Sequence, residues 1–393
     1  MPKSTIDNKL TCAWLLVPFL VALFFPPYSG PGLFNPEPIS SSMKYLALFS
    51  GVLVLVVNYR KITLDALDVL LAIVIFAMLF STTINKGDTI SVVTGSIKYI
   101  LTYSVIKMYL RHEAAFLFRW STIIISILII INLMTMVLIM KDDPEGMRFG
   151  DNVNMWFLGN KNSIRNYIFP ALACSLIYEK HFQKRKPVLT RVLCVVSVGT
   201  LYVVDSMTPL LILVACIVVY ALQESGMIQL TSRSVLAVYC VSLSSVLVLP
   251  SIDFFKKFIT EFLHRSITYS GRTEVWSQAF ASIGEHLWLG VGLQQGARQG
   301  LLDAGGWRSL SHAHNAAIDL LYKYGLICLI AAAGMLILCC KKLYQNREFY
   351  PAKIIALTMG AFLLCGIFGE LTSEFFIFIL AVAYNIEFMD KVA

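Results

Sequence analysis

The sequence predicts an all-α polytopic membrane protein, and three observations support this class. Hydrophobic residues make up 57% of the 393-residue chain and charged residues 14%, whereas about a quarter of a soluble domain is charged. The mean hydropathy is +0.72. Apolar runs of bilayer-crossing or nearly bilayer-crossing length recur along the whole chain. We therefore expect a single integral membrane domain over residues 1–393.

About twelve apolar runs are predicted to be transmembrane helices, although several are short for a hydrocarbon core of about 30 Å. In chain order they are 11–25, 45–58, 65–83, 92–109, 120–140, 164–179, 191–204, 207–222, 234–250, 313–339, 353–369 and 372–389.

The distribution of basic residues predicts the orientation of these helices. The short connections on one side hold most of the Lys and Arg residues, including the run 180–186, and inner-leaflet phospholipid accounts for this excess. The opposite connections at 26–43, 205–208 and 369–371 hold none. Because basic connections stay in the cytoplasm, both termini are expected there.

Two longer outer segments, 141–166 and 251–312, are basic although they face outward. Long loops are exempt from the charge rule, and loops of this length are more often functional than mere spacers. The long extracytoplasmic loop 251–312 is therefore expected to form part of an active site.

Several function classes lack sequence support. All nine cysteines lie in or at the ends of apolar segments, so neither a disulfide framework nor a zinc spacing is indicated. The chain has no P-loop, no clear inverted repeat and no intramembrane Asp/Glu/His relay. The expectation is a protein without cofactor or metal that uses neither ATP nor an ion gradient.

Within the long loop, residues 271–290 predict an amphipathic helix. Its apolar positions recur at helical spacing, and they are Val275, Trp276, Ala279, Phe280 and Ile283. Arg272 and Glu274 lie in its first turn, where a guanidinium beside free N–H groups suits an anion. A basic, glycine-rich loop with Arg298 and Arg308 follows, and it matches no phosphate-binding fingerprint.

The stretch SHAHNAAIDLLYKYGLICLI at 311–330 begins the tenth apolar run. Ser311 is predicted to cap this helix, which places His314 and Asn315 in its first turn. A helix N-terminus disfavours imidazolium, so His314 should stay neutral and able to accept a proton. Asp319 and Lys323 continue a polar stripe that should face the bundle or a wet cavity.

These residues carry a resemblance to a known family. His314-Asn315, nine further residues and then Gly325 resemble the H-[NSQ]-x9-G signature of bacterial O-antigen ligases and related polymerases, with Cys328 replacing the usual last residue. SGRTEVW followed by HLWLGVG resembles the family's Arg-x-x-x-Trp helix and the glycine motif after it, although Trp288 replaces a common proline. GNKNSIRN at 159–166 is similar to the entry of a central helix in the same superfamily.

One departure concerns the middle of the chain. Ligases of this family often carry an arginine just after a middle span, whereas this chain has Asp205-Ser206-Met207-Thr208-Pro209 there. Arg165 and Arg298 are the two candidates to replace that arginine.

The resemblance implies a membrane glycosyltransferase of the GT-C-like type that uses an undecaprenyl-diphosphate-linked oligosaccharide and needs no metal. Arg272, with Arg298 or Arg308, would bind the diphosphate, and Arg165 would be a second phosphate contact. His314 would orient or deprotonate the acceptor hydroxyl, and Asn315 would hold the imidazole or a sugar hydroxyl. Three tryptophans are suited to stack on sugars or to form an interfacial belt: Trp156, Trp276 and Trp307. Glu274 and Glu370 are candidates for either substrate binding or ion pairing with an arginine.

Three functions stay open at this stage. The first is a polymerase that joins repeat units of a capsule, exopolysaccharide or O-antigen on the outer face of the bacterial cytoplasmic membrane. The second is a ligase that transfers the finished glycan to another acceptor. The third is a non-enzymatic exporter, which should place its polar residues at mid-membrane instead of in outer loops. Expected partners are membrane lipid, a flippase and a chain-length regulator, with no nucleic acid.

Overall fold

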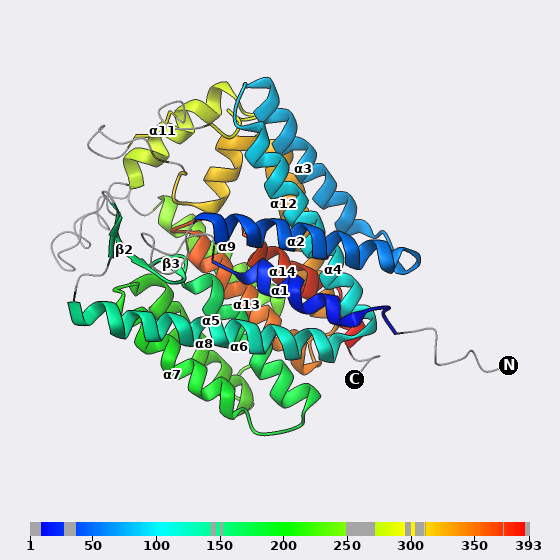
Figure 1. The fold of residues 1–393 in the computed structure, drawn as a ribbon. Helices are drawn as coiled ribbons and strands as arrows, with labels where there is room; N and C mark the ends of the chain where they lie inside the picture. The colour runs from blue at the N-terminus through cyan, green and yellow to red at the C-terminus, as the bar shows by residue number, and fades with distance from the viewer. Residues whose placement is uncertain are drawn as a thin grey trace.

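The computed structural model describes residues 9–26, 37–142, 147–149, 152–248, 272–294, 300–302, 310, 312–371 and 373–389. Helices dominate this part of the chain and occur at each of the twelve predicted positions (Figure 1). The first seven are α1 (Leu16–Phe24), α2 (Glu37–Val57), α3 (Ala66–Ile84), α4 (Thr89–His112), α5 (Ala114–Asp142), α6 (Arg165–Ile177) and α7 (Val188–Val203). The others are α8 (Met207–Glu224), α9 (Ser232–Val248), α11 (Arg272–Glu285), α12 (Ala316–Gln345), α13 (Tyr350–Gly366) and α14 (Glu374–Tyr384).

Helix length and composition fit a membrane protein. In the described part of the chain, five helices are long and apolar enough to cross a bilayer, namely α3, α4, α5, α8 and α12. Shorter apolar helices of 10–17 residues make up most of the remainder. The total of twelve spans and the GT-C-like type stay predictions.

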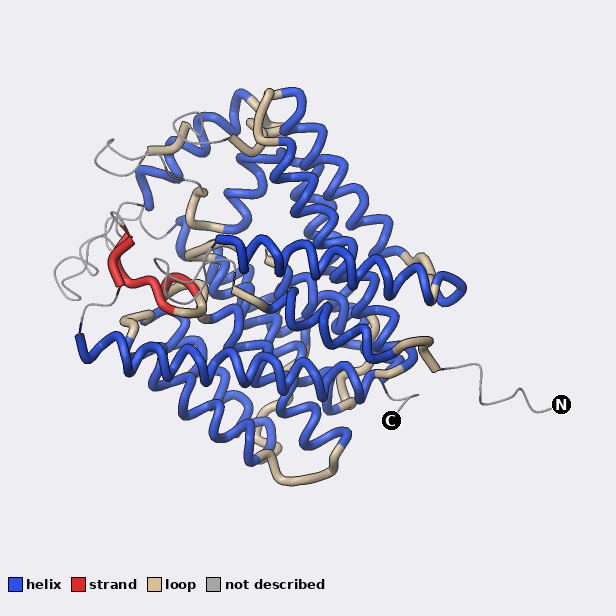
Figure 2. The backbone as a smooth tube through the Cα atoms, in the orientation of Figure 1, coloured by secondary structure: helices blue, strands red, loops and turns tan. Residues whose placement is uncertain are grey.

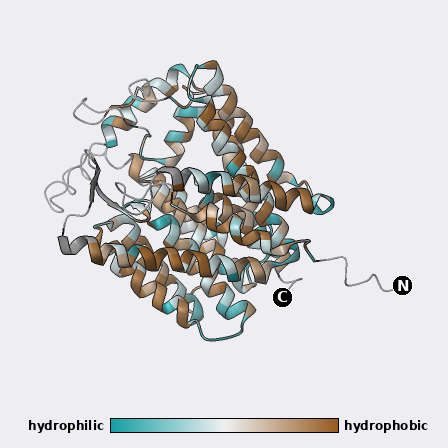
Figure 3. Ribbon diagram, viewed as in Figure 1, coloured by the Kyte–Doolittle hydropathy of each residue, from teal (hydrophilic) through white to brown (hydrophobic). Residues whose placement is uncertain are grey.

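The outer surface of the bundle is apolar. Phe76, Met134, Val195 and Leu211 lie more than half exposed on four different helices. Figure 3 shows hydrophobic colour over the bodies of α3 and α5 and hydrophilic colour at the turns. A large exposed apolar surface on a helical protein is expected where lipid covers it.

The interior is formed by helices from both halves of the chain. Phe24 of α1 stacks on Phe375 of α14 with ring centroids 5.2 Å apart, and Phe169 of α6 meets Phe362 of α13 edge-on at 5.8 Å. Phe24 and Phe362 are at most 1% exposed. Burial of such a side chain from water contributes about 1.5–3 kcal/mol, and the close fit holds α6, α13 and α14 at the centre.

The connections between helices gather at two ends of the bundle. Four side-chain contacts join the connections at one end: Asn58 with Thr11, Arg111 with Asn385, Lys180 with Glu224 and Gln229 with Glu348. We call this the basic end; its connections are 58–65, 113, 183–187, 225–231 and 346–349.

The opposite end carries the remaining described connections. Asn85 contacts Gly290, and Lys161 pairs with Asp205 at 3.7 Å. We call this the site end; its connections are 85–88, 157–164, 204–206, 286–294, 312–315 and, on either side of one residue that is not described, 367–371 and 373. The separation agrees with the predicted charge asymmetry, while the side of the membrane on which each end lies stays a prediction.

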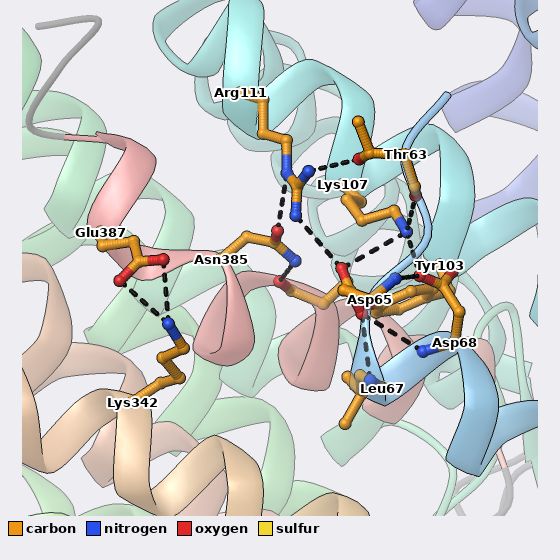
Figure 4. A network of polar contacts seen from close by, with 11 residues as sticks. Thr63, Asp65, Leu67, Asp68, Tyr103, Lys107, Arg111, Lys342, Asn385 and Glu387 are labelled. Atoms are coloured by element: carbon orange, nitrogen blue, oxygen red, sulfur yellow. Dashed lines mark hydrogen bonds and ion pairs between the residues drawn. The ribbon is translucent and has the colours of Figure 1, made fainter. Parts of the chain in front are cut away.

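A largely buried polar network joins α3 and α4 at the basic end (Figure 4). Asp65 caps α3 by accepting hydrogen bonds from the N–H groups of Leu67 and Asp68, and Asp68 accepts one from the N–H of Asp65. Lys107 and Arg111 of α4 pair with these two carboxylates. Two acids therefore face two bases, which offsets the cost of removing each charge from water.

Three short strands at the site end were not predicted by the all-α expectation. They are β1 (Met147–Phe149), β2 (Asn152–Trp156) and β3 (Gly159–Asn160), and they form an antiparallel sheet in the order β1-β2-β3 (Figure 2). The side-chain amide oxygen of Asn132 on α5 accepts a hydrogen bond of 3.0 Å from the N–H of Leu158. This contact anchors the β2–β3 turn just before α6 begins.

Candidate functional site

The start of α12 differs from the prediction. Asn315, not Ser311, is the N-cap: its side-chain oxygen accepts hydrogen bonds from the N–H groups of Ala317 and Ile318, both 3.1 Å long. Ser311 lies outside the described residues. The helix cannot include His314, because this residue has φ 52°, a left-handed backbone conformation. His314 therefore lies directly before α12.

The cap residue is fully engaged by backbone groups. The Asn315 side-chain amide donates a hydrogen bond of 3.1 Å to the carbonyl of Ile367, just after α13. Asn315 is 1% exposed. Asn315 therefore ties the start of α12 to the end of α13; its predicted contact with a sugar hydroxyl or the imidazole stays a prediction.

His314 lies against a second histidine. The rings of His312 and His314 have centroids 4.0 Å apart in an edge-on arrangement, and the Nε2 of His312 lies 3.5 Å from the Oε1 of Glu370. Burial lowers the pKa of His314 to about 4, with smaller contributions from His312 and Arg272. The expected neutral imidazole is thus explained chiefly by desolvation and by neighbouring positive charge.

The charge of Glu370 is also disfavoured. Burial raises the pKa of the Glu370 carboxyl, although Lys323 and Arg165 oppose this shift. Burial likewise lowers the pKa of His312. Both groups of this contact are therefore biased toward their neutral forms.

Arg165 is a buried cation at the first position of α6. It is 6% exposed, and its guanidinium donates to the carbonyls of Cys365 at 3.1 Å and Glu370 at 3.0 Å. Its Nε is buried without a hydrogen-bond partner among the described residues. An unpaired buried donor on a cation costs about 1–3 kcal/mol or more, so the described residues leave part of the hydrogen-bonding capacity of Arg165 unused.

Arg272 converges on the same place from α11. Its guanidinium carbon lies 5.4 Å from the centre of the Phe368 ring, in the connection between α13 and α14. Burial lowers the pKa of Arg272, and the positive charge of Arg165 adds to this shift. Among the described residues, neither arginine forms an ion pair within 4.0 Å.

Trp276 and Asp319 hold the chain in front of His314. The indole N–H of Trp276 donates a hydrogen bond of 2.8 Å to the carbonyl of Ala313, and the N–H of Ala313 donates one of 2.9 Å to Asp319 Oδ1. The other oxygen of Asp319 pairs with Lys323 at 2.8 Å. Both backbone polar groups of Ala313, which belong to the two peptide units on either side of its Cα, are therefore fixed directly before His314.

This arrangement gives a physical reason for the Arg-x-x-x-Trp spacing. Residues four apart lie on the same face of a helix, so Arg272 and Trp276 approach the start of α12 together. Trp276 anchors the backbone while Arg272 reaches the Phe368 connection.

An interruption of α12 explains the glycine of the signature. Gly325 has φ 76° and ψ −177° within α12, and a Cβ at this position would lie 2.2 Å from the Trp288 carbonyl oxygen. The carbonyl of Lys323, freed at the break, accepts hydrogen bonds from Gly292 N at 2.7 Å and Ser81 Oγ at 2.9 Å. Polar backbone inside an apolar bundle is tolerated only when it is satisfied in this way.

The structure brings some of the predicted site residues together but not others. His314, Asn315, Arg165 and Arg272 come together at the site end. Glu274 is exposed and accepts a hydrogen bond only from Thr273 among the described contacts, while Trp276 is buried. Trp156 is likewise buried. The predictions for Arg298, Arg308 and Trp307 lie outside the described residues.

His312 joins the site without a role assigned from the sequence, whereas Lys323 was expected in a polar stripe and Glu370 as a candidate for substrate binding or ion pairing with an arginine. The double histidine in SHAHN was the local signal for His312. Glu370 gave only a weak signal, because its position next to His312 depends on how α13 packs beside α12. No group of three His, Cys, Asp or Glu side chains is close enough to hold a metal in the described part of the chain.

The fold and the site thus define a helical membrane protein with two converging arginines beside a neutral histidine. Residues 192–333 match a family model described as O-antigen ligase. The match confirms the resemblance to the O-antigen polymerase and ligase superfamily, whose members are glycosyltransferase-like enzymes acting on lipid-linked oligosaccharides. No curated protein matches the chain. The family and the apolar helices fit a protein of the bacterial inner membrane.

Proposed function

We propose that the chain is a polysaccharide polymerase that joins undecaprenyl-diphosphate-linked repeat units on the outer face of the cytoplasmic membrane. The observation that carries the proposal is the convergence of Arg165 and Arg272, without ion-pair partners in the described residues, beside the neutral His314. Such a site suits a dianionic leaving group next to a proton acceptor.

The two guanidinium groups have the chemistry to bind the donor diphosphate. As the anomeric carbon–oxygen bond breaks, negative charge grows on the departing diphosphate, and preorganised cations stabilise that charge. Because arginine stays protonated and offers several donors in a plane, it suits phosphate oxygens better than lysine. Neither a nucleotide nor a metal ion is required by this scheme.

His314 acts on the acceptor. A hydroxyl of the second glycan attacks the anomeric carbon, and its proton moves to the neutral imidazole. The products are a new glycosidic bond and polyprenyl diphosphate. Asn315, Trp276 and Asp319 serve as positioning residues, because their polar atoms hold the backbone on either side of His314.

The polymerase is preferred to a ligase because of the connection after α7. Where ligases often carry an arginine, Asp205 is exposed and pairs with Lys161, and Arg165 supplies a cation from the start of α6 instead. Ligase activity is the alternative, supported by the description of the matching family model. An exporter is less well supported, since the charged site lies at one end of the bundle. In this scheme both termini are cytoplasmic, and a flippase and a chain-length regulator would act before and beside the protein.

The test compares surface glycan and extracted lipid-linked sugars from cells with wild-type, deleted and His314→Ala forms. A polymerase predicts single repeat units where wild type gives a ladder, at equal protein level. Polymer that stays on the lipid carrier, unattached, would instead indicate a ligase. His286→Ala is the matched control, because His286 is an exposed histidine in a connection at the same end of the bundle. An unaltered ladder in His314→Ala cells would contradict the proposed role of His314.

A further inference from the structure

A large groove lies between four helices, with its mouth at the basic end and its inner end at Phe169, one turn of α6 from Arg165. Its volume is about 760 Å³, and its walls come from α6, α7, α8 and α13. Leu172, Cys194, Ile217 and Leu357 are representative of the lining, which is apolar along most of its length. α7 and α8 lie at the edge of the bundle (Figure 1, bottom), so the groove borders the lipid-facing surface.

The mouth of the groove is basic. Lys180, Lys184, Arg185, Lys186 and Arg191 all line it. Only two of these five cations are used in ion pairs among the described residues: Lys180 contacts Glu224, and Arg185 lies 3.4 Å from Glu179. Lys184, Lys186 and Arg191 are exposed and form no ion pair with a described residue. Three positive charges are therefore left to attract an anion.

The connection that carries these charges has a fixed backbone. Glu179 is 1% exposed, and its carboxylate accepts hydrogen bonds from Leu189 N at 3.1 Å and from Thr190 N at 2.9 Å. It thereby caps α7 from the neighbouring π-helix (Tyr178–Phe182). Because the cap ties the two helices together, the basic side chains are presented at one place beside the groove.

The dimensions of the groove fit one leaflet of a bilayer. Its lining on α8 extends from Leu213 to Glu224, a distance of about 17 Å at the helical rise. Half of the hydrocarbon core of a bilayer is about 15 Å thick. An acyl chain can therefore lie along the apolar walls while a headgroup reaches the basic mouth.

The geometry points to a binding site for an anionic phospholipid from the leaflet at the basic end; we propose phosphatidylglycerol or a lipid of the same headgroup charge as the occupant. A basic pocket between transmembrane helices attracts anionic headgroups. The donor lipid is disfavoured as the occupant, because the basic mouth lies at the end opposite to the proposed diphosphate site; this exclusion rests on the proposed function. The assignment of an anionic phospholipid to the groove does not depend on that function, because it rests on the apolar walls and the basic mouth.

The experiment uses the purified full-length protein in detergent and native mass spectrometry. Wild type is titrated with phosphatidylglycerol and with phosphatidylcholine of identical acyl chains. One variant removes the free charges (Lys184→Gln, Lys186→Gln and Arg191→Gln), and a second, Ile217→Trp, fills the groove without a change of charge. The matched control removes three exposed cations of the basic end that do not line the groove: Arg60→Gln, Arg119→Gln and Lys341→Gln.

The expected result is one phosphatidylglycerol bound at least tenfold more tightly than phosphatidylcholine. Both groove variants should weaken this binding at least tenfold at an unchanged unfolding midpoint, while the control binds as wild type does. Equal binding of the two lipids would overturn the headgroup assignment. Equal losses in the charge variant and the control would show a diffuse charge effect instead of a site. Displacement of phosphatidylglycerol by equimolar undecaprenyl phosphate would assign the groove to the carrier lipid.

Discussion

Replacement of Arg165 gives the sharpest test of the site. Arg165→Met removes a buried cation of similar length, together with its hydrogen bonds to the carbonyls of Cys365 and Glu370. Arg165→Lys keeps the charge but cannot reproduce the planar arrangement of donors. The two variants therefore separate the effect of charge from the effect of geometry.

The magnitudes follow from these contacts. Loss of one preorganised donor that stabilises developing negative charge lowers a rate about 10²- to 10³-fold, and this is the expectation for Arg165→Met. For Arg165→Lys we expect a loss of about tenfold, since one hydrogen bond of about 1.4 kcal/mol is broken while the charge remains. Arg165→Met should not lower the unfolding midpoint much, because the variant also relieves repulsion from Arg272.

The assay is the initial rate at which lipid-linked repeat units are consumed in membranes with equal amounts of each variant. Lys161→Gln is the matched control, since Lys161 lies four residues earlier and makes only a 3.7 Å ion pair with the exposed Asp205. Its rate should change little, because surface pairs contribute about 0–1 kcal/mol. Wild-type consumption by folded Arg165→Met would refute the idea that this cation binds the donor.

Three further predictions follow from the same region. Gly325→Ala should lower the unfolding midpoint and the yield of folded protein, because a positive φ costs about 1–2 kcal/mol for other residues and the new methyl group would meet a backbone carbonyl. The control is Gly95→Ala, which has open space around it and should raise the unfolding midpoint slightly. In the rate–pH profile, the rate should fall on the acid side with a midpoint near pH 4, not near 6.5, because His314 is neutral above its lowered pKa and loses its ability to accept a proton only as pH falls through about 4. The same midpoint should persist in Glu370→Gln. A midpoint near 6.5 would contradict the assignment to His314. Trp276→Phe removes one buried hydrogen bond and should cost about 1–3 kcal/mol of stability, measured by thermal unfolding. The rate at saturating substrate should also fall. No change in either quantity would show that the indole N–H does not position the segment before His314.

The sequence by itself determined where most helices form. Apolar runs and helical spacing are local properties, so the helix at 272–285 and its buried residues Val275, Trp276 and Ile283 follow from residues a few positions apart. The His-Asn pair, Gly325 and the Arg-x-x-x-Trp spacing were also visible locally. Three short strands near residue 150 were missed. β1 and β3, with three and two residues, are shorter than the about four to eight residues that predict a strand. β2 has five residues and was overlooked because its outer segment was interpreted as a loop.

Only the tertiary structure decided which of these groups meet. Arg165 and Arg272 are more than a hundred residues apart, and they influence each other because α6 and α11 converge on the connection after α13. The cap of α12 was misassigned for a related reason: Asn315 is held by the Ile367 carbonyl of another helix. The groove beside α7 likewise needs four helices to exist. Local periodicity arises from neighbours in the chain, whereas burial, pKa shifts and the pairing of charges arise from packing between distant segments.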